Sequence, residues 1–263
     1  MTAKWGHAGG DRPAIVALSQ APRALLASVR VVASDIDGTM TRDGRLDPAV
    51  LDAIAALVAA GIEVLPVSGR PAGEVLGLAR YLPGVRRALA ENGLAQCVPG
   101  DAVTSLGSAP DRARLLAVAA TLATPSSPMR PAEDAFCRLC DLAFERDGRD
   151  DATLAGMRRA AEAQGVHLIW SNVHVHLSLD MPDKGRAVLD VCARDGIDPT
   201  TVLAIGDAPN DVGFWQPGRF GVPVGCAQVL EQRAVLDAEP RYLVGEAAEG
   251  WLEMARLLLA ARA

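Results

Sequence analysis

The sequence predicts an α/β protein with a doubly wound parallel-sheet core and a small inserted α+β domain. Short apolar segments typical of buried strands alternate with helical patterns early in the chain, and the same alternation returns after about residue 180. Several of these strands are followed directly by acidic or hydroxyl side chains, at the place where open α/β sheets carry their chemistry. The residues between, about 97 to 180, have a different texture, which indicates a separate unit.

Composition limits the classes of function. The chain has 263 residues, half of them apolar but only 4% aromatic, so Ala, Leu and Val must build the core. A net charge of −6 and a pI of about 5.3 argue against a protein that binds nucleic-acid phosphates. The N-terminus lacks the apolar segment of a signal peptide, and no uncharged apolar run approaches the ~18 residues of a membrane span. We therefore expect a cytoplasmic protein without nucleic-acid or membrane partners.

The first predicted strand ends in two carboxylates. Before it, residues 1–28 form a Gly-, Pro- and Ala-rich lead-in of uncertain order, in which Pro22 interrupts a helical pattern. The strand runs into Asp35 and Asp37, and Gly38 tolerates the tight turn that follows. Residues two apart share a face of a strand, so the two carboxylates repel each other. A divalent cation removes that cost, and Mg²⁺ is a hard cation that prefers oxygen ligands.

A helix and a second strand complete the first unit. Asp47 can cap the helix, Pro48 suits its first position and Gly61 ends it. The strand over residues 62–67 follows and ends in Ser68. Because the two strands of such a unit are parallel, we expect Ser68 at the same sheet edge as the two aspartates.

The middle of the chain is expected to form the inserted domain. After a helix from 71 to about 82, the pattern predicts a helix over 111–124, a strand near 136–144, a helix over 150–165 and one or two strands within 166–179. We therefore divide the chain into an N-terminal extension (1–28), a core (29–96 and 181–263) and a cap (97–180).

The last third returns to alternating strands and helices. Lys184 opens a helix, and a strand over residues 201–205 leads to Asp207, with Asn210 and Asp211 close behind it. Further strands are expected over 220–224 and 242–244, and a final helix over 247–262.

Seven polar side chains are thereby predicted at one edge of the sheet: Asp35, Asp37, Ser68, Lys184, Asp207, Asn210 and Asp211. Such a set makes a poor core but a good site for Mg²⁺ and a phosphate, which needs neutralisation and hydrogen-bond donors. One carboxylate can attack phosphorus and form an aspartyl-phosphate. A second, two residues along, can give a proton to the leaving oxygen and later take one from water.

Four segments resemble the sequence motifs of the haloacid dehalogenase (HAD) superfamily of phosphatases. They are Asp35–Thr39 (DIDGT), Ser68–Arg70 (SGR), Lys184–Gly185 (KG) and Gly206–Asp211 (GDAPND), and their order and spacing match the family. The long insert, with Glu91–Gly93 just before it, resembles the C2B type of cap. That cap occurs in Cof-type, sucrose-phosphate, mannosyl-3-phosphoglycerate and archaeal-type phosphoglycolate phosphatases. Met40 stands where the family usually has Leu, which leaves the chemistry intact.

The resemblance implies a catalytic role for four residues. Asp35 would be the nucleophile, and Asp37 would be the general acid and base. Ser68 would hold the phosphoryl oxygens. Lys184 would neutralise the charge of the nucleophile and of the phosphate.

The resemblance also implies the residues that bind metal and phosphate. Mg²⁺ would be bound by Asp35, by the backbone carbonyl of Asp37 and by Asp207, with Asp211 acting indirectly or through water. Gly38 and Gly69 would serve as backbone positions, Gly38 helping the neighbouring amides to reach the phosphate. Asn210 would support the phosphate or its loop.

We expect an enzyme that hydrolyses a small phosphorylated metabolite, a sugar phosphate or a phosphoglycolate-like acid, as a monomer or homodimer. The cap would exclude bulk water and select the leaving group. Two alternatives remain open from the sequence. One is a phosphosugar mutase, since phosphomannomutases share this fold and cap type, and the other is a catalytically idle binding protein.

Three arginines carry weaker patterns. Arg70 either faces the substrate or pairs with a carboxylate. Arg138 lies in a predicted apolar strand, which favours a contact between the cap and a carboxylate or phosphate of the substrate. Arg130 is expected to be an ordinary surface residue.

Histidines and cysteines offer other chemistry. His174 and His176 share one side of a predicted strand, and without a third ligand we expect them on an exposed sheet face. Cys137 and Cys140 form a CxxC pattern, which could indicate redox or zinc chemistry, but their apolar surroundings favour small buried side chains. An odd total of five cysteines favours reduced thiols.

Overall fold

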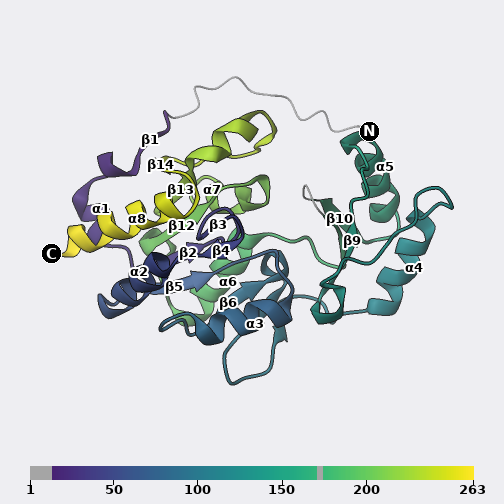
Figure 1. Cartoon of the computed structure of the whole chain (residues 1–263), viewed down its shortest axis with the longest axis horizontal. Coiled ribbons are helices and arrows are strands. Elements are labelled where there is room, and N and C mark those ends of the chain that lie inside the picture. Colours follow the sequence, from purple (N-terminus) through teal and green to yellow (C-terminus); the bar gives the residue numbers. More distant parts are fainter. Residues whose placement is uncertain (1–13, 171–173) are drawn as a thin grey trace.

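The computed structural model describes residues 14–170 and 174–263 and shows a larger and a smaller lobe (Figure 1). The larger lobe is built on a six-stranded sheet in the order β1-β14-β13-β12-β2-β5, in which every pairing is parallel. Its strands are β1 (Val16–Ala17), β2 (Val31–Ser34), β5 (Glu63–Pro66), β12 (Val202–Gly206), β13 (Val222–Cys226) and β14 (Tyr242–Val244). The predicted parallel α/β core is confirmed.

Helices cover both faces of this sheet. On one face Val32 and Leu203 belong to a buried cluster with side chains of α1 (Arg23–Ala27), α2 (Pro48–Ala59), α3 (Ala72–Tyr81) and α8 (Ala247–Arg262). Ala33 and Ala204 belong to the opposite cluster, with side chains of α6 (Lys184–Asp195) and α7 (Val212–Trp215). Successive residues of a strand point to opposite faces, so these strands are buried on both sides. That burial explains their continuous apolar runs.

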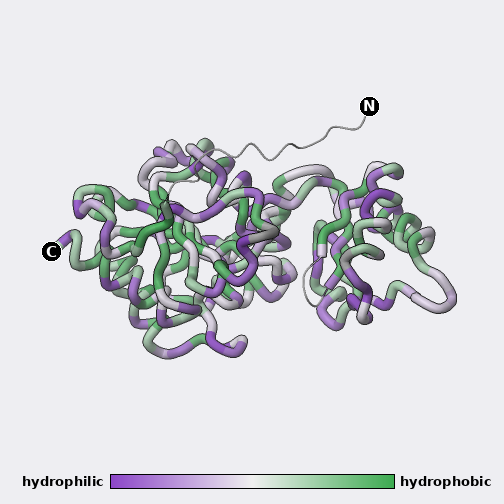
Figure 2. Tube along the Cα trace, turned by 90° about the horizontal axis from the view of Figure 1, so that it is seen from above, coloured by the Kyte–Doolittle hydropathy of each residue, from purple (hydrophilic) through white to green (hydrophobic). Residues whose placement is uncertain are grey.

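The smaller lobe has its own sheet and its own core. Its antiparallel strands, in the order β10-β11-β9, are β9 (Asp141–Glu145), β10 (His167–Trp170) and β11 (His174–Ser178). Two helices, α4 (Arg112–Leu122) and α5 (Asp151–Glu162), pack on one face of this sheet around buried Leu115 and Leu154. Figure 2 shows the two lobes side by side, each with hydrophobic segments inside.

Short elements connect these parts. The hairpin of β3 (Thr41–Arg42) and β4 (Arg45–Leu46) follows the first strand of the core. A small antiparallel sheet of β6 (Ala88–Ala90), β7 (Ala95–Cys97) and β8 (Thr104–Ser105) extends the larger lobe beside β5, through a bridge between Val67 and Leu89. The 3₁₀ turns are η1 (Leu18–Gln20), η2 (Glu91–Gly93), η3 (Ala135–Cys137), η4 (Pro199–Thr201), η5 (Pro209–Asp211) and η6 (Ala227–Val235). The paired strands of the larger lobe thus reach residue 105, beyond the predicted boundary at 97.

Local sequence signals account for several helix ends. The Asp47 side chain accepts a hydrogen bond from the Ala49 N–H (3.2 Å), and Asp150 accepts one from the Thr153 N–H (2.8 Å). Gly196 ends α6 with a φ of +66°, a conformation that glycine adopts without strain. The last helix begins and ends at the predicted residues.

The N-terminal lead-in differs from its expectation in one respect. Residues 1–13 lie outside the described part of the chain. Residues 16–17 add β1 to the edge of the core sheet beside β14. Pro22 does not interrupt a helix but stands directly before α1, because proline at a helix start lacks only an N–H that would be unpaired there.

The predicted strand near 136–144 is only partly correct. Residues 135–137 form the turn η3, and the strand begins at Asp141. The N–H groups of Leu139 and Cys140 donate to the Glu91 carboxylate instead of to a neighbouring strand. Phe136, predicted within the strand, is 88% exposed.

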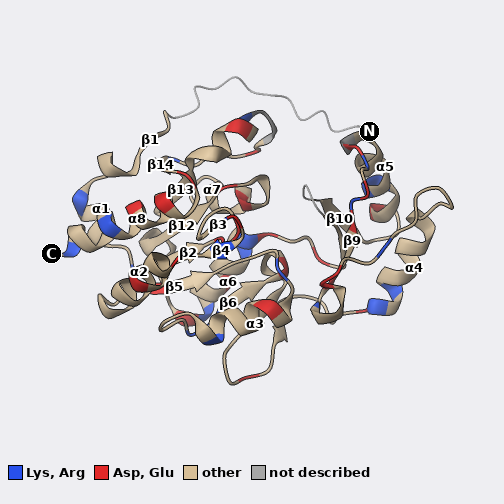
Figure 3. Ribbon diagram, viewed as in Figure 1, with Lys and Arg blue, Asp and Glu red and all other residues tan. Residues whose placement is uncertain are grey.

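Charged residues are mixed over the surface. In the view of Figure 3, acidic and basic residues are interspersed on both lobes.

Within residues 14–170 and 174–263, no helix is both long and apolar enough to cross a membrane.

Candidate active site

Three neighbouring strands end at one edge of the core sheet and carry the predicted polar residues. The register pairs Ser34 of β2 with Pro66 of β5 and with Ile205 of β12. The residues that follow these strands therefore come together, among them Asp35 and Asp207. This is the edge at which open α/β sheets bind their ligands.

Lys184 connects the nucleophile strand to the acidic loop after β12. Its side chain is fully buried, and its Nζ donates to Asp35 Oδ1 (2.5 Å) and Asp211 Oδ1 (2.6 Å). Asp183, which caps α6 by accepting from the Arg186 N–H (2.9 Å), places Lys184 at the first turn of the helix. Burial alone would lower the pKa of Lys184, but the charges of Asp211 and Asp35 outweigh it and raise that pKa.

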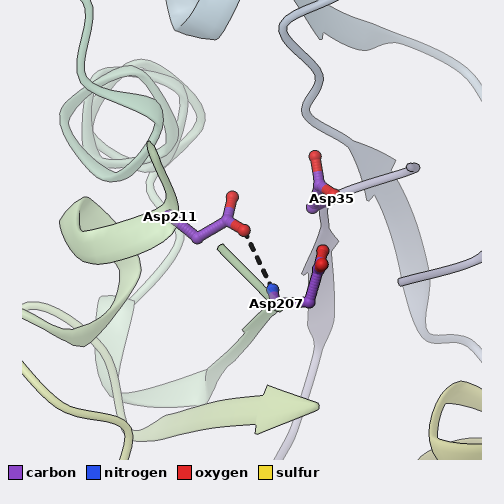
Figure 4. Close-up of side chains that lie close together, drawn as sticks. All are labelled: Asp35, Asp207 and Asp211. Atoms are coloured by element: carbon purple, nitrogen blue, oxygen red, sulfur yellow. Dashed lines mark hydrogen bonds between the residues drawn. The ribbon is translucent and has the colours of Figure 1, made fainter. Parts of the chain in front are cut away.

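Three carboxylates form an acidic cluster at this point. One carboxylate oxygen from each of Asp35, Asp207 and Asp211 lies within 4.8 Å of the other two. Figure 4 shows the three side chains close together. Burial is the main cause that raises the pKa of both Asp35 and Asp207, and repulsion between the carboxylates adds to it. One ammonium group faces three carboxylates, so the cluster carries more negative charge than Lys184 neutralises. The donor set, all carboxylate oxygen, fits a hard divalent cation such as Mg²⁺.

The loop after the first strand approaches this cluster closely. Gly38 has a φ of +79°, and a Cβ there would lie 2.5 Å from Asp207 Oδ2, so a side chain has no room. The Thr39 hydroxyl donates to Asp207 Oδ1 (2.8 Å). The Gln228 side chain donates to the Gly38 carbonyl (2.6 Å) and accepts from the Ala247 N–H (3.3 Å). Sequence reasoning missed Gln228, since it lies in a turn far along the chain and belongs to no motif.

Asp37 points away from the cluster toward Arg70. The Arg70 guanidinium donates to both Asp37 oxygens (2.7 and 2.8 Å) and to Glu74 (2.9 Å). The hydrogen bond with Asp37 is the main cause that raises the pKa of Arg70. Of the two readings of Arg70 that the sequence left open, the structure shows the pairing with a carboxylate.

The remaining predicted residues lie around the same edge. Ser68 is buried, and its hydroxyl oxygen accepts from the Arg70 N–H (3.1 Å). This hydrogen bond closes a tight turn with Gly69 in the middle. Asn210 is exposed and its amide donates to Asn92 Oδ1 (3.3 Å). Asp211 also shapes its own loop, because its Oδ2 accepts from the Asp207 and Ala208 N–H groups (2.9 and 3.1 Å).

Arg138 lies elsewhere, at the junction with the smaller lobe. It stands outside the strand in which it was predicted, and its side chain is 2% exposed. Its guanidinium donates to Asp134, to Asp141 and to the Gly69 carbonyl. These bonds commit the guanidinium to protein groups, which gives the predicted substrate contact no support.

The histidine prediction needs a correction. His176 is buried, and its Nδ1 lies 2.9 Å from Asp141 Oδ2, a hydrogen bond in which the ring donates to the carboxylate. An exposed sheet face was expected, but this histidine is buried, and the neighbouring strand β9 provides the acceptor at its first residue, Asp141. His174 is half-buried, with its Nε2 3.9 Å from Glu145.

The cysteines agree with the preferred reading. All five thiols are free, and Cys140 is buried while Cys137 is half-buried. The two side chains donate to different carbonyls, Asp134 for Cys137 (3.3 Å) and Leu94 for Cys140 (3.4 Å). Burial is the main cause that raises the pKa of both thiols, which disfavours the reactive thiolate.

Comparisons with known proteins extend over most of the chain, although it matches no protein-family model. It is 30% identical over 254 residues to a phosphoglycolate phosphatase from Aeropyrum pernix, covering 89% of this chain and 95% of that relative. A solved structure from Thermoplasma acidophilum has a TM-score of 0.71 at 22% identity and covers 88% of this chain and 98% of that one. A haloacid dehalogenase-like hydrolase from Bacteroides thetaiotaomicron has a TM-score of 0.65 at 17% identity and covers 87% of this chain and 98% of that one.

The relative and the solved structures resemble this chain over most of its length. The similarity to the Aeropyrum pernix enzyme covers nearly all of both proteins, and the structural matches show the same fold, core and cap together. The four motif segments meet at one edge of the core sheet. The chain therefore belongs to the haloacid dehalogenase superfamily and is one of its phosphatases, which hydrolyse phosphoric monoesters.

Proposed function

We propose that this protein hydrolyses a small, carboxylate-bearing phosphomonoester of the phosphoglycolate type, with Mg²⁺, through an aspartyl-phosphate on Asp35. The observation that carries the proposal is the buried group of Asp35, Lys184, Asp207 and Asp211 at the sheet edge. A buried lysine shared by two carboxylates, beside a third, has no role in packing a core. It supports a site for a cation and an anion together.

In the first step, a carboxylate oxygen of Asp35 attacks the phosphorus atom. The bond from phosphorus to the ester oxygen breaks, and Asp37 gives its proton to the departing alkoxide. Lys184 already donates to Asp35 Oδ1, which orients the carboxylate and leaves Oδ2 for the attack. The Ser68 hydroxyl and Lys184 supply donors to the phosphoryl oxygens, where negative charge is concentrated.

In the second step, water attacks the phosphorus atom of the aspartyl-phosphate. Asp37 takes a proton from that water, the acyl-phosphate bond breaks, and Asp35 and inorganic phosphate are restored. The Asp37 carboxylate lies outside the acidic cluster, and Arg70 donates to both of its oxygens. In this mechanism Asp37 therefore has to leave Arg70 before it can exchange a proton with the leaving oxygen or with water.

Mg²⁺ fits the oxygen donors of Asp35 and Asp207, with Asp211 beside them. When bound, it supplies positive charge that offsets the repulsion among these carboxylates and the charge of the phosphate. The backbone carbonyl of Asp37 is the further ligand that the family resemblance implies. Asp211 is expected to act indirectly, since Lys184 and two backbone N–H groups already occupy its oxygens.

The proposed substrate class is supported by the similarity to a relative, because the catalytic residues of the core sheet do not select the leaving group. The Aeropyrum pernix protein is named a phosphoglycolate phosphatase, and the similarity extends through the cap, which selects the leaving group. A sugar phosphate is the competing class for a cap of this type. No observation favours a mutase, which would return a phosphoryl group to the sugar instead of releasing it to water.

The test is phosphate release from a panel of phosphomonoesters, with Mg²⁺ and with a chelator. The panel includes phosphoglycolate, sucrose phosphate, mannosyl-3-phosphoglycerate, hexose phosphates and p-nitrophenyl phosphate. We expect Mg²⁺-dependent release with the highest kcat/KM for phosphoglycolate. A preference for a hexose phosphate would overturn the substrate class, and release that is equal with the chelator would overturn the metal requirement.

A further inference from the structure

The turn that carries Ser68 is held at all three of its carbonyl groups. The Ser68 carbonyl accepts from the Asn92 N–H (2.9 Å), and the Arg70 carbonyl accepts from the Glu91 N–H (3.0 Å). Both donors are backbone groups of the larger lobe. The middle carbonyl, of Gly69, accepts from Arg138 Nη1 (3.3 Å), a side chain of the segment that precedes β9 of the smaller lobe.

Arg138 is fixed by carboxylates on its other sides. Its Nε and Nη2 donate to the two oxygens of Asp134 (3.0 and 2.7 Å), and its Nη1 also donates to Asp141 Oδ1 (3.0 Å). Asp141 is equally buried and accepts in addition from His176 on β11. The guanidinium is thus part of a buried network of the smaller lobe and reaches out of it at one point, to Gly69.

Glu91 fixes the backbone that follows Arg138. The Glu91 side chain is fully buried, its Oε1 accepts from the Leu139 N–H (2.7 Å), and its Oε2 accepts from the Cys140 and Asp141 N–H groups (2.6 and 2.9 Å). Glu91 of the larger lobe therefore contacts both the turn that carries Ser68 and the segment that carries Arg138. Its N–H donates to the turn, and its carboxylate accepts from the backbone that follows Arg138.

We propose that Arg138 is a positioning residue for the phosphate-binding turn Ser68–Gly69–Arg70, so that the smaller lobe supports phosphate binding without touching the substrate. The inference rests on the proposed function, in which Ser68 holds the phosphoryl oxygens. The Gly69 carbonyl belongs to the peptide that ends in the Arg70 N–H, which donates to the Ser68 hydroxyl oxygen. Fixing that carbonyl fixes the plane of this peptide, and with it the donor that orients the hydroxyl.

This role differs from a direct contact between Arg138 and the substrate. To reach a substrate, Arg138 would have to leave Asp134 and Asp141, of which Asp141 is 2% exposed. A buried carboxylate without its partner is strongly unfavourable. A positioning role requires no such movement and uses the contacts as they stand.

The experiment compares Arg138→Gln with Arg130→Gln. Arg130 is a matched control because it is also an arginine of the smaller lobe paired with an aspartate, Asp147, but it is 63% exposed. Two quantities are measured with Mg²⁺: kcat and KM for phosphoglycolate and for p-nitrophenyl phosphate, and the Kd of inorganic phosphate by calorimetry. For Arg138→Gln we expect kcat/KM to fall about 10- to 100-fold by a similar factor for both substrates, and phosphate binding to weaken about 10-fold. Arg130→Gln should match the wild type.

Two results would overturn the inference. A loss confined to phosphoglycolate, with the aryl phosphate and inorganic phosphate unaffected, would show that Arg138 contacts the leaving group. A lower melting temperature with unchanged kinetics and unchanged phosphate binding would show that Arg138 is only structural. Both results differ from failure of the proposed function, which would appear as a wild type without phosphatase activity.

A second variant covers the case in which Arg138→Gln does not fold. Glu91→Gln keeps the shape of the side chain and leaves the charges of Arg138, Asp134 and Asp141 unchanged. Its amide NH₂ replaces one carboxylate oxygen and cannot accept a hydrogen bond, so the backbone N–H groups that donate to that oxygen lose their acceptor. We expect the same parallel loss for both substrates, smaller than for Arg138→Gln. Hydrogen exchange of the Asn92 amide, which donates to the Ser68 carbonyl, should accelerate in this variant and provides a readout independent of catalysis. Unchanged exchange together with unchanged kinetics would contradict the inference.

Discussion

At the scale of single residues, the site depends on the balance between one buried ammonium group and three carboxylates. Lys184 is shared between Asp35 and Asp211, and burial raises the pKa of Asp35 while the lysine opposes that rise. Removing one charge therefore has a different effect at each position. If Asp35 loses its charge, Lys184 still pairs with Asp211, whereas removal of Lys184 leaves two buried carboxylates without their counter-charge.

Asp35→Asn is expected to abolish turnover and preserve the fold. The amide keeps the size of the carboxylate and can still accept from Lys184, but it cannot attack phosphorus. We expect kcat to fall by about 10⁴-fold or more, with a melting temperature equal to or above that of the wild type because one buried negative charge is gone. Appreciable residual activity in a carefully purified sample would contradict the covalent mechanism.

Lys184→Met is expected to reduce both activity and stability. Asp35 and Asp211 keep their burial but lose their counter-charge, a change that costs about 3–5 kcal/mol for a buried pair. The phosphoryl group also loses a charged donor, for which we expect a fall in kcat of about 10²–10³-fold. Urea unfolding and steady-state kinetics measure the two effects separately. A variant as stable as the wild type would show that Lys184 does not offset the carboxylates.

At the scale of elements, close backbone contacts fix where the site residues stand. Lys184 begins α6, and the next residue, Gly185, packs directly on α7, where a Cβ would lie 2.0 Å from the Gly213 carbonyl oxygen. Arg219 donates to Asp183, the cap of α6, and to the same Gly213 carbonyl (2.8 and 3.1 Å). The position of the lysine is therefore set by the contact between two helices.

Gly185→Ala and Gly77→Ala form a matched pair that tests this contact. At Gly185 the added methyl group meets backbone atoms that cannot move aside, so we expect a destabilisation of about 1–3 kcal/mol and a loss of activity as Lys184 shifts. Gly77 lies within α3, and apart from its own neighbours in the helix nothing lies within 4 Å of an added Cβ. Alanine there should stabilise the helix by about 0.5–1 kcal/mol with activity unchanged. Equal effects of the two substitutions on kinetics would refute the packing argument.

At the scale of the whole molecule, two lobes meet at a buried polar junction. Glu91 of the larger lobe accepts from the backbone at the start of β9, and Arg138 donates back to Gly69. Burial opposes ionisation of Asp141 at this junction, but the hydrogen bond from His176 and the charge of Arg138 outweigh it and hold the pKa of Asp141 below its usual value. The junction is therefore sensitive to acid.

The acid sensitivity has a definite sign. A carboxyl group whose folded-state pKa is depressed contributes stability above its unfolded value, about 3.9, and loses that contribution as the pH falls through the folded-state pKa. Asp141→Asn should lower the melting temperature at pH 7, because it reduces the free energy of unfolding by up to about 3–5 kcal/mol. The gap between wild type and variant should narrow as the pH falls below about 4. Thermal unfolding followed by circular dichroism measures this gap, and a constant difference across the range would exclude a titrating Asp141.

Local signals in the sequence were sufficient where a residue interacts with its near neighbours. The caps Asp47 and Asp150, the ends of α8 and the strand over residues 242–244 follow from side-chain hydrogen bonds, glycine conformations and apolar periodicity. Those signals failed where the side chain of a residue distant in the sequence accepts the backbone hydrogen bonds. The strand expected from residue 136 begins only at Asp141, because Glu91 accepts the N–H groups just before it.

The sequence by itself determined the parallel α/β core, the segments that reach its active edge and the superfamily to which they belong, because each depends on patterns within short stretches of chain. The tertiary structure decided which side chains meet. It paired Asp37 with Arg70, buried His176 against Asp141 and brought Gln228 to the Gly38 carbonyl. These contacts join residues 33, 35 and 190 positions apart, and no local periodicity encodes a distance of that kind.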